Sequence, residues 1–265
     1  MGAQAWAAAE SVAGVDDQAL LRSISQQAQQ LYEHKKLPPM RLLRSQLVRS
    51  QTALKLAAAP RAALAPAELY RRATASVLVH CQLYHCDKCN NLHVSPSTCF
   101  PLTSDGVCAA NHHVFMGSNT LAMVVATRDG RVFPVTEVLA ASERDDVVLF
   151  RVAAEQLAPL ALGAAEVGDP VAVISHPHSL FYVMTQGAVA RYCFEKGVPR
   201  MQITADYAGG SSGGPVLNAC GAVAGMVAKT QDLYADDQHG DHKNLQMVVK
   251  LCVPSASIRK LIKEE

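Results

Sequence analysis

The chain has 265 residues, of which 49% are hydrophobic and 18% charged, and its formal net charge is +1. A chain of this length and composition can bury a substantial core in one or two domains, so we expect most of it to be folded. The small net charge gives no indication of a nucleic-acid partner. No apolar run reaches the length of a membrane span, and residues 1–10 do not have the pattern of a secretory signal.

Residues 1–66 are predicted to form a helical N-terminal extension, because they are rich in Ala, Gln, Leu and Arg and poor in glycine. Asp16 and Asp17 can begin a first helix. Apolar residues then follow at helical spacing, at Leu20, Ile24, Ala28 and Leu31. A second helix is expected over about residues 40–56, after a pair of prolines that ends the first. Nothing in this extension resembles a catalytic site, so we interpret it as an arm that packs on the main domain or on another subunit.

From Ser76 onward the pattern changes to short apolar runs that are separated by turn pairs such as Asp105-Gly106 and Asp129-Gly130. The runs of the first half are SVLVH, TCFPL, VCAAN, LAMVVAT and VVLFRV. Those of the second half are VAVISH, QGAVARY, MQITA, GPVLN, AVAGMVA and LQMVVKL. The turns recur too quickly for crossover helices, which favours a mainly β chain of antiparallel barrels or sandwiches. A C-terminal helix is expected over about residues 255–262.

The most specific motif is Gly-Ser-Ser-Gly-Gly-Pro at positions 210–215. A serine hydroxyl needs a neighbouring base to become a nucleophile, and it needs N–H groups aimed at the oxygen that becomes negative. Glycines on both sides allow the backbone to bend so that the N–H groups of Gly210 and Ser212 converge as an oxyanion hole. The alternative interpretation of this motif is a glycine-rich turn between two strands.

Two further segments precede this motif in the chain. Asn-His-His-Val-Phe carries His113 at the end of a β run, and Asp-Asp-Val-Val-Leu-Phe carries Asp146 at the start of a buried strand. With these local contexts, the order His, Asp, Ser resembles the trypsin-like serine peptidases and, among them, the HtrA/Deg branch. The resemblance covers about residues 67–265. We expect no PDZ domain, which is typical of many HtrA proteins, within these residues.

The resemblance implies two six-stranded antiparallel β-barrels, over residues 67–158 and 159–265, with the active site in the cleft between them. His113 would accept the proton of Ser212, and Asp146 would orient the imidazole. His112 and Asp145 compete with these residues as neighbours, but the family register selects His113 and Asp146. Digestive relatives carry an aspartate before the nucleophile, where this chain has a serine, so activation by N-terminal cleavage is not expected.

Asp206 lies six residues before Ser212, a spacing that in trypsin relatives places a side chain at the base of the primary specificity pocket. A carboxylate there would select Lys or Arg before the scissile bond. The HtrA-like resemblance instead implies small aliphatic residues, and Asp206 would then be a surface or loop-bracing residue. Both interpretations stay open at this point.

The chain has eight cysteines, five of them between positions 81 and 108. Cys86, Cys89 and His93 have a spacing that one tetrahedral zinc ion could use, with Cys81, His85 or His80 as a fourth ligand. The alternative is a loop with a disulfide or with free thiols between the first two strands.

We therefore expect a serine endopeptidase that acts through an acyl-enzyme on protein or peptide substrates and requires no cofactor for its chemistry, with or without a structural zinc. The main alternative is a catalytically inactive trypsin-fold module that binds peptides or partners, with or without a Cys/His metal or redox site. A second alternative is a metal- or redox-sensing protein built on the cysteines between positions 81 and 108. The family resemblance also favours a periplasmic or other extracytoplasmic location and a homo-oligomer, and we expect neither a nucleic-acid partner nor a membrane span.

Overall fold

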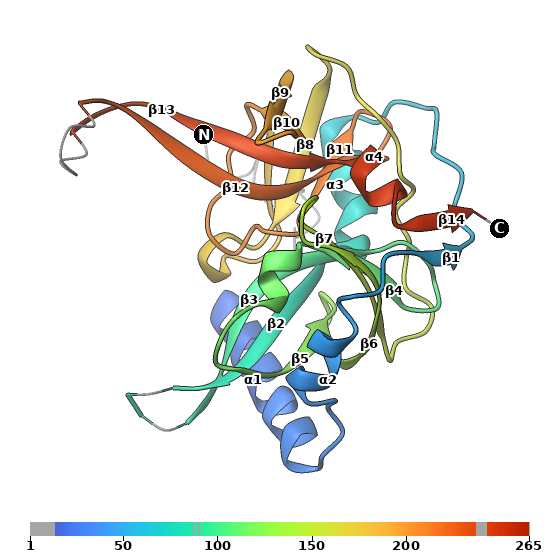
Figure 1. Ribbon diagram of the computed structural model, residues 1–265, viewed down its shortest axis with the longest axis vertical. Helices are drawn as coiled ribbons and strands as arrows, with labels where there is room; N and C mark the ends of the chain where they lie inside the picture. Colours follow the sequence, from blue (N-terminus) through green and yellow to red (C-terminus); the bar gives the residue numbers. More distant parts are fainter. Residues whose placement is uncertain (1–13, 87, 90, 237–242, 265) are drawn as a thin grey trace, which may run out of the picture.

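The computed structural model describes residues 14–86, 88–89, 91–236 and 243–264. Its core is a pair of closed six-stranded barrels in which each strand runs antiparallel to its neighbours (Figure 1). The expected mainly β architecture of two antiparallel barrels, with an N-terminal helical extension and a C-terminal helix, is confirmed. Among the described residues, no helix has the length and apolar character that crossing a membrane requires.

The first barrel has the strand order β2-β3-β4-β7-β6-β5. Its strands are β2 (Leu78–His85), β3 (Leu92–Pro101), β4 (Val107–Ala110), β5 (Thr120–Ala126), β6 (Val132–Ser142) and β7 (Val147–Val152). A short 3-10 helix, η2 (His112–Phe115), follows β4. Strands β2 and β3 extend beyond the barrel as a hairpin (Figure 1).

The second barrel has the order β10-β13-β12-β11-β8-β9. Its strands are β8 (Pro170–Ser175), β9 (Val183–Glu195), β10 (Val198–Ile203), β11 (Pro215–Asn218), β12 (Val223–Asp236) and β13 (Lys243–Pro254). A short 3-10 helix, η3 (Pro177–Ser179), follows β8, and α4 (Ser255–Arg259) follows β13.

Continuous apolar runs form strands here because both of their faces are buried. In β7, Val148 and Phe150 point into the first barrel, whereas Val147 and Leu149 join a second cluster that also contains residues of the other barrel and of the N-terminal arm. Successive side chains of a strand alternate between its two faces, so a run with no polar position indicates packing on both. The cluster between the barrels therefore holds them together.

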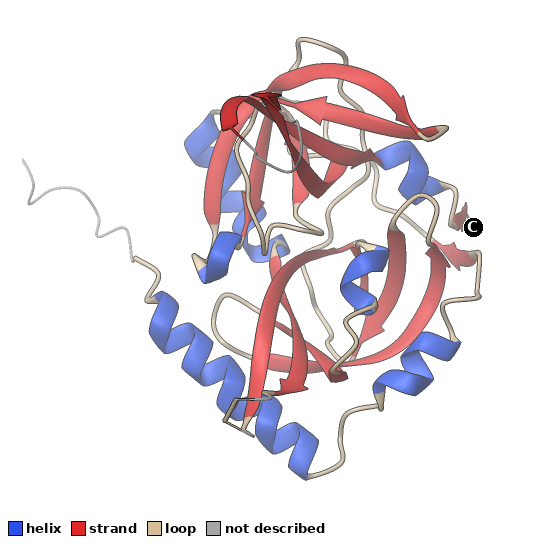
Figure 2. Ribbon diagram, turned by 60° about the vertical axis from the view of Figure 1, so that its left-hand side comes forward, coloured by secondary structure: helices blue, strands red, loops and turns tan. Residues whose placement is uncertain are grey.

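The N-terminal arm begins with α1 (Asp17–Glu33), whose first turn is capped by the Asp16 carboxylate. Ile24 and Ala28, one helical turn apart, are fully buried against the first barrel, as their spacing predicts. Figure 2 shows α1 as the longest helix, lying along the outside of the barrels.

The second predicted helix was wrong in extent, because α2 (Met40–Ser45) stops early and the chain then becomes extended as β1 (Thr52–Leu54). Tertiary hydrogen bonds override helix propensity here. The Gln46 amide oxygen accepts from the Val138 N–H, and the Arg49 guanidinium donates to the Val138 carbonyl. These bonds attach the segment to the edge of β6.

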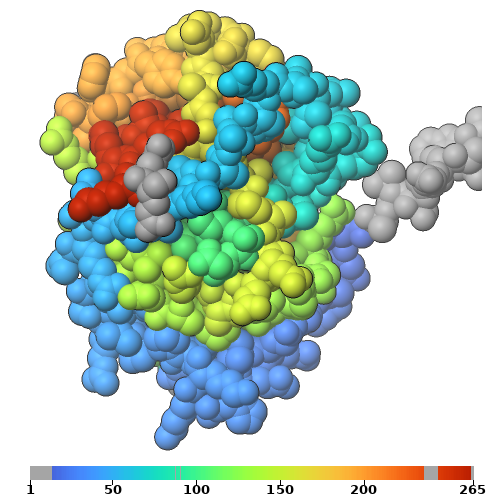
Figure 3. Space-filling view, turned by 90° about the vertical axis from the view of Figure 1, so that its right-hand side faces the viewer, coloured from blue at the N-terminus to red at the C-terminus, as the bar shows by residue number. Residues whose placement is uncertain are grey.

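The predicted C-terminal helix was also too long, since Ile262 lies in β14 (Ile262–Glu264) rather than in α4. Strand β14 pairs in parallel with β1, so the arm and the end of the chain form a small two-stranded sheet. Figure 3 shows the arm lying beside the C-terminal segment on this face. The sequence analysis also missed a helix, α3 (Pro66–Ala73), and strand β6.

Candidate active site

Three segments meet between the two barrels: the one after β4, the turn before β7 and the loop before β11. His113 lies in η2, directly after β4, and Asp146 ends the turn before β7. Ser212 belongs to the second barrel, three residues before β11. The structure thus brings together His113, Asp146, which is 33 positions later in the chain, and Ser212, which is 99 positions later.

A continuous chain of hydrogen-bonding groups joins the three side chains. His113 Nε2 lies 3.0 Å from the Ser212 hydroxyl, and His113 Nδ1 lies 2.9 Å from Asp146 Oδ2. An ionised carboxylate accepts a hydrogen bond, so Nδ1 carries the proton and the lone pair of Nε2 faces the serine. In this tautomer the imidazole can accept the Ser212 proton.

The Asp146 carboxylate is held by the backbone as well as by the imidazole. Its Oδ1 accepts a hydrogen bond of 3.0 Å from the His113 N–H, and its side chain is only 17% exposed. Asp146 adopts a positive φ of 64°, an uncommon conformation for a non-glycine residue. The Asn111 amide, which donates to the Asp146 carbonyl over 3.2 Å, helps to hold that conformation.

His112 and Asp145, the neighbours of His113 and Asp146 in the sequence, occupy different positions in the structure. His112 is buried and lines the cleft, but it is His113 whose ring lies against Ser212. Asp145 turns away from His113 towards the second barrel, where its Oδ1 contacts Lys260 and Ser257. His113 rather than His112 thus contacts Ser212, and Asp146 rather than Asp145 contacts His113.

The loop before Ser212 approaches other backbone so closely that side chains are excluded. Gly210 has a φ of +93°, and a Cβ there would lie 2.5 Å from the His176 carbonyl oxygen. A Cβ at Gly213 would lie 2.0 Å from the Thr98 carbonyl oxygen. Only glycine tolerates both the positive φ and this approach, which explains the spacing of the motif.

Hydrogen bonds fix the peptide that carries the Gly210 N–H. The Gly209 carbonyl accepts from the His178 N–H over 2.7 Å, so the Gly210 N–H on the same planar trans peptide points the opposite way. Within the described residues, the N–H groups of Gly210 and Ser212 donate to no other residue. They are therefore available to a negatively charged oxygen beside Ser212.

Ser211 takes the place where digestive relatives carry a charged residue. It is fully buried, and its hydroxyl accepts hydrogen bonds from the Ser175 hydroxyl (2.9 Å) and from the Ala208 N–H (3.4 Å). A neutral hydroxyl in this position needs no buried counter-charge. Thr98 adds a second brace, since its hydroxyl donates to the Gly210 carbonyl and its N–H to the Ser212 carbonyl.

A cleft of about 280 Å³ opens beside His113 and is lined by both barrels. The lining residues are His112, His113, Met116, Glu143, Asp146, Arg200, Ala228 and Lys229. Lys229 pairs with Glu195, and its hydrogen bond holds the pKa of that carboxyl below the usual value. Glu195 also pairs with Arg200 of the same wall at 3.6 Å, so one carboxylate faces two positive charges.

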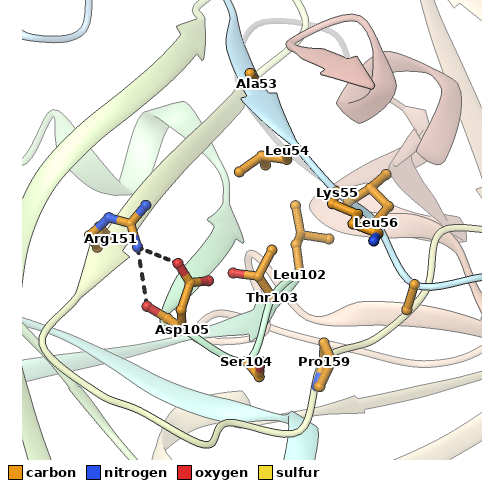
Figure 4. A pocket seen from close by; sticks show the side chains of 11 residues that line it. Ala53, Leu54, Lys55, Leu56, Leu102, Thr103, Ser104, Asp105, Arg151 and Pro159 are labelled. Atoms are coloured by element: carbon orange, nitrogen blue, oxygen red, sulfur yellow. Dashed lines mark hydrogen bonds and ion pairs between the residues drawn. The ribbon is translucent and has the colours of Figure 1, made fainter. Parts of the chain in front are cut away.

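A second hollow, of about 510 Å³, lies between the segment that begins with β1 and the turn around Asp105 (Figure 4). Arg151 closes one side by donating to the Asp105 carboxylate and carbonyl. His113, Asp146 and Ser212 do not line this hollow. We therefore assign the candidate active site to the cleft between the barrels.

Asp206 does not lie where a pocket-base carboxylate would. Its side chain is 82% exposed, and one carboxylate oxygen pairs with the Lys250 ammonium at 2.7 Å. Its carbonyl accepts from the Thr185 hydroxyl, so the residue braces a loop at the surface. The expectation of a buried, substrate-facing carboxylate does not match this placement.

The next residue, Tyr207, was missed by the sequence analysis. Its buried hydroxyl lies 3.1 Å from the Lys229 carbonyl on β12 and 3.0 Å from the Leu251 carbonyl on β13, and its single proton can be donated to either. Burial raises the pKa of this phenol, so it stays protonated and remains a donor. The sequence does show a large aromatic residue five positions before Ser212. The spacing of apolar residues does not reveal that this ring is buried between strands.

Cys86, Cys89 and His93 come together at the tip of the β2–β3 hairpin, far along the strands from Ser212. The fourth ligands that we considered do not join them. His80 and Cys81 are fully buried in the barrel wall, and His85 lies outside the described cluster. No disulfide links the described cysteines.

Comparisons with known proteins agree with this geometry. A family model described as a trypsin-like peptidase domain matches residues 97–226, a range that contains His113, Asp146 and Ser212. A Halomonas elongata protein named "Probable periplasmic serine endoprotease DegP-like" is 32% identical over 136 residues, which are 48% of this chain and 28% of that protein. A Synechocystis sp. protein named "Putative serine protease HhoB" is 34% identical over 138 residues, or 48% of this chain and 32% of that protein.

A Hahella chejuensis protein with the same DegP-like name is 30% identical over 134 residues, again 48% of this chain and 28% of that protein. This chain thus spans less than a third of the length of these curated relatives. The expected resemblance to trypsin-like peptidases and their HtrA-type relatives is confirmed over that stretch.

Proposed function

Because the chain carries a trypsin-like peptidase domain, we propose that it is a serine endopeptidase in which Ser212 is the nucleophile, His113 the general base and Asp146 the orienting carboxylate. The observation that carries this proposal is the position of the His113 ring, with one nitrogen 3.0 Å from the Ser212 hydroxyl and the other 2.9 Å from Asp146. A ring that only filled space would not need a partner at both nitrogens.

The proposed reaction follows from this arrangement. His113 Nε2 takes the proton as Ser212 Oγ forms a bond to the carbonyl carbon of the substrate. The carbonyl oxygen becomes negative and receives hydrogen bonds from the N–H groups of Gly210 and Ser212. The imidazolium, stabilised by Asp146, then gives its proton to the leaving amine as the C–N bond breaks. Water hydrolyses the acyl-enzyme, with His113 again acting as the base. None of these steps requires a metal ion or cofactor.

We propose that a small apolar residue precedes the scissile bond, rather than Lys or Arg. In trypsin relatives the primary pocket lies beside the segment that leads to the nucleophile, and here Tyr207 of that segment reaches across to β12 and β13. The phenol takes up room that a long side chain would need. The carboxylate that could attract a cation, that of Asp206, is at the surface and paired with Lys250.

The substrates in this proposal are proteins or peptides, and the location is extracytoplasmic. The location follows the names of the relatives, two of which are called periplasmic. Assembly into a homo-oligomer belongs to the same proposal and is tested by the mass of the purified protein in solution.

The proposal is tested by hydrolysis of a quenched-fluorescence peptide library by the purified chain and by its Ser212→Ala variant. We expect cleavage at internal bonds by the unmodified chain and a loss of about 10⁴-fold or more in turnover for the variant. Equal activity of the two proteins would overturn it. No activity in either protein, despite native folding by circular dichroism, would favour the inactive binding module.

A further inference from the structure

We propose that Cys86, Cys89 and His93 form a site for one Zn²⁺ ion per chain at the tip of the β2–β3 hairpin. The three residues each offer one donor atom, and these atoms all lie within 4.8 Å of one another. Cys89 Sγ lies 3.1 Å from His93 Nε2. This proposal does not depend on the proposed peptidase activity.

The hairpin backbone determines which side chains meet. The strand register pairs Tyr84 with His93 and His85 with Leu92, and the Cys86 N–H then donates to the Asn91 carbonyl over 3.0 Å. Cys86 therefore lies directly beyond the end of the ladder, and His93 stands on the ladder itself, so the paired strands hold these two ligands in place.

The observed distances suit a tetrahedral ion. Zn–S bonds of about 2.3 Å and Zn–N bonds of about 2.0 Å put neighbouring donor atoms roughly 3.5–3.8 Å apart. Here Cys89 Sγ and His93 Nε2 are 3.1 Å apart, and all three donor atoms lie within 4.8 Å of one another, so small side-chain rotations would bring them to that separation. Cys89 and His93 are exposed and Cys86 is half-buried, so side-chain rotation can complete the geometry and an ion can enter from solvent.

The ligand chemistry selects the metal. Two thiolates and one imidazole are soft or borderline donors, which favour Zn²⁺ over Ca²⁺ or Mg²⁺, the ions that prefer oxygen ligands. Binding requires the thiols to lose their protons, so affinity should rise with pH.

The fourth coordination position stays open to water or to a donor from another molecule. His80 cannot supply it, because its Nδ1 lies 2.8 Å from the Ser97 hydroxyl inside the first barrel. Cys81 is fully buried in the same strand. His85 faces away, since it pairs with Leu92 and neighbouring side chains of a strand point to opposite faces. The cluster among the described residues thus has three protein ligands.

A disulfide between Cys86 and Cys89 is the competing state. It would explain two cysteines at this spacing, but it would require no third residue. The His93 nitrogen directed at the Cys89 sulfur is instead the arrangement that a metal site needs. The two states differ in whether Zn²⁺ binds under reducing conditions, which makes them separable by experiment.

The experiment uses the full chain, purified with a non-thiol reductant and stripped of metal with a chelator. Zn²⁺ is titrated against a chromophoric competitor, and metal content is measured by mass spectrometry. Co²⁺ is added to a second sample, in which thiolate ligation gives a charge-transfer band in the near ultraviolet. We expect one Zn²⁺ per chain and a clear Co²⁺ band for the unmodified protein.

The Cys86→Ser, Cys89→Ser double variant should lose stoichiometric binding, and His93→Ala should weaken binding by at least about tenfold. Cys193→Ser and Cys220→Ser, which alter half-buried cysteines outside the cluster, are matched controls that should bind like the unmodified chain. Binding that survives the double variant overturns the proposal. So does an unmodified chain that, when reduced, takes up no Zn²⁺ and gives no Co²⁺ band, a result that stands even if a variant fails to fold. Peptide hydrolysis should persist in the double variant.

Discussion

The Lys260 ammonium lies 3.0 Å from the carboxylate of Asp145 and so connects the end of α4 to the turn that presents Asp146. Ser257 of the same helix donates to this carboxylate at 3.2 Å, and the Arg200 guanidinium donates to the Asp145 carbonyl at 3.0 Å. Three groups of the second barrel thus hold a turn of the first barrel. Asp145 acts as a positioning residue for the site across the boundary between the barrels.

We therefore predict that Asp145→Ala lowers kcat by up to about 10²-fold while KM changes little, because Asp146 loses its fixed position. The side chain is 11% exposed, and its loss leaves Ser257 without that acceptor, so a stability loss of about 1–3 kcal/mol should accompany the kinetic effect. Asp145→Asn, which keeps one hydrogen-bonding oxygen, should recover part of kcat. Steady-state kinetics and urea unfolding of both variants measure this, and an Asp145→Ala enzyme with unchanged kcat would contradict it.

His113→Ala should reduce turnover by about as much as loss of Ser212, roughly 10⁴-fold or more, because the base is removed. Asp146→Asn should be nearly as damaging, since an amide in place of the carboxylate favours the wrong imidazole tautomer. His112→Ala, the matched control, should have a much milder effect, because its ring lines the cleft without contacting Ser212. Equal rates for the two histidine variants, measured by peptide hydrolysis, would remove the assignment.

Substrate preference should depend on Tyr207 and not on Asp206. Tyr207→Ala should shift cleavage towards larger residues before the scissile bond, because it removes the ring between the loop and β12 and β13. Tyr207→Phe retains the ring and should keep the original preference. Asp206→Ala, which alters an exposed side chain, should leave the preference unchanged. A library profile with a basic preference that disappears in Asp206→Ala would restore the pocket role of that residue.

Stability should fall between pH 6.5 and about pH 4 because of two buried histidines. Burial lowers the pKa of His80 to about 4 and that of His176 to about 3, whereas histidine in an unfolded chain titrates near pH 6.5. In this range the unfolded chain binds protons that the folded chain does not, so the free energy of unfolding decreases as pH falls. Each histidine contributes at most about 1.4 kcal/mol per pH unit.

Urea unfolding at several pH values tests this, with His80→Gln compared against a substitution of the exposed His34. His80 packs against Phe115 and Phe150, and its pKa is lowered by burial, so burial should govern its titration. The His80→Gln variant should show a shallower pH dependence than the unmodified chain, and His34→Gln should not. Identical slopes in all three proteins would show that the His80 pKa is not lowered by folding.

Apolar runs separated by turn pairs predicted antiparallel barrels or sandwiches, and the family resemblance selected the two barrels that the structure has. The sequence also indicated His113, Asp146 and Ser212 as candidate site residues, because each lies in a distinctive local motif and the three occur in the order of the family. It could not predict β6, in which Pro134 and an alanine-rich end hide the strand pattern. The residue at which α2 ends could not be predicted either, because it depends on hydrogen bonds from Gln46 and Arg49 to β6.

The sequence also could not predict the direction in which particular side chains point. The resemblance to trypsin relatives left Asp206 either at the base of a pocket or at the surface, and the conformation of its loop turns the carboxylate to Lys250 and buries Tyr207. The same applies to the fourth ligand of the proposed zinc site. His85 is adjacent to Cys86 in sequence but occupies the other face of the strand from His93. Both cases depend on strand alternation and loop geometry that residue spacing does not encode.

The central claim is that Ser212 is an activated nucleophile, and the most direct measurement is the site of labelling by a fluorophosphonate probe. Its phosphorus is attacked by an activated serine oxygen and fluoride leaves, so a stable adduct marks the nucleophile. Tandem mass spectrometry of the digested protein locates that adduct. We predict one adduct per chain, on Ser212, with labelling abolished in Ser212→Ala and strongly slowed in His113→Ala. An adduct on Ser211, or a natively folded chain that takes up no label, would contradict the account.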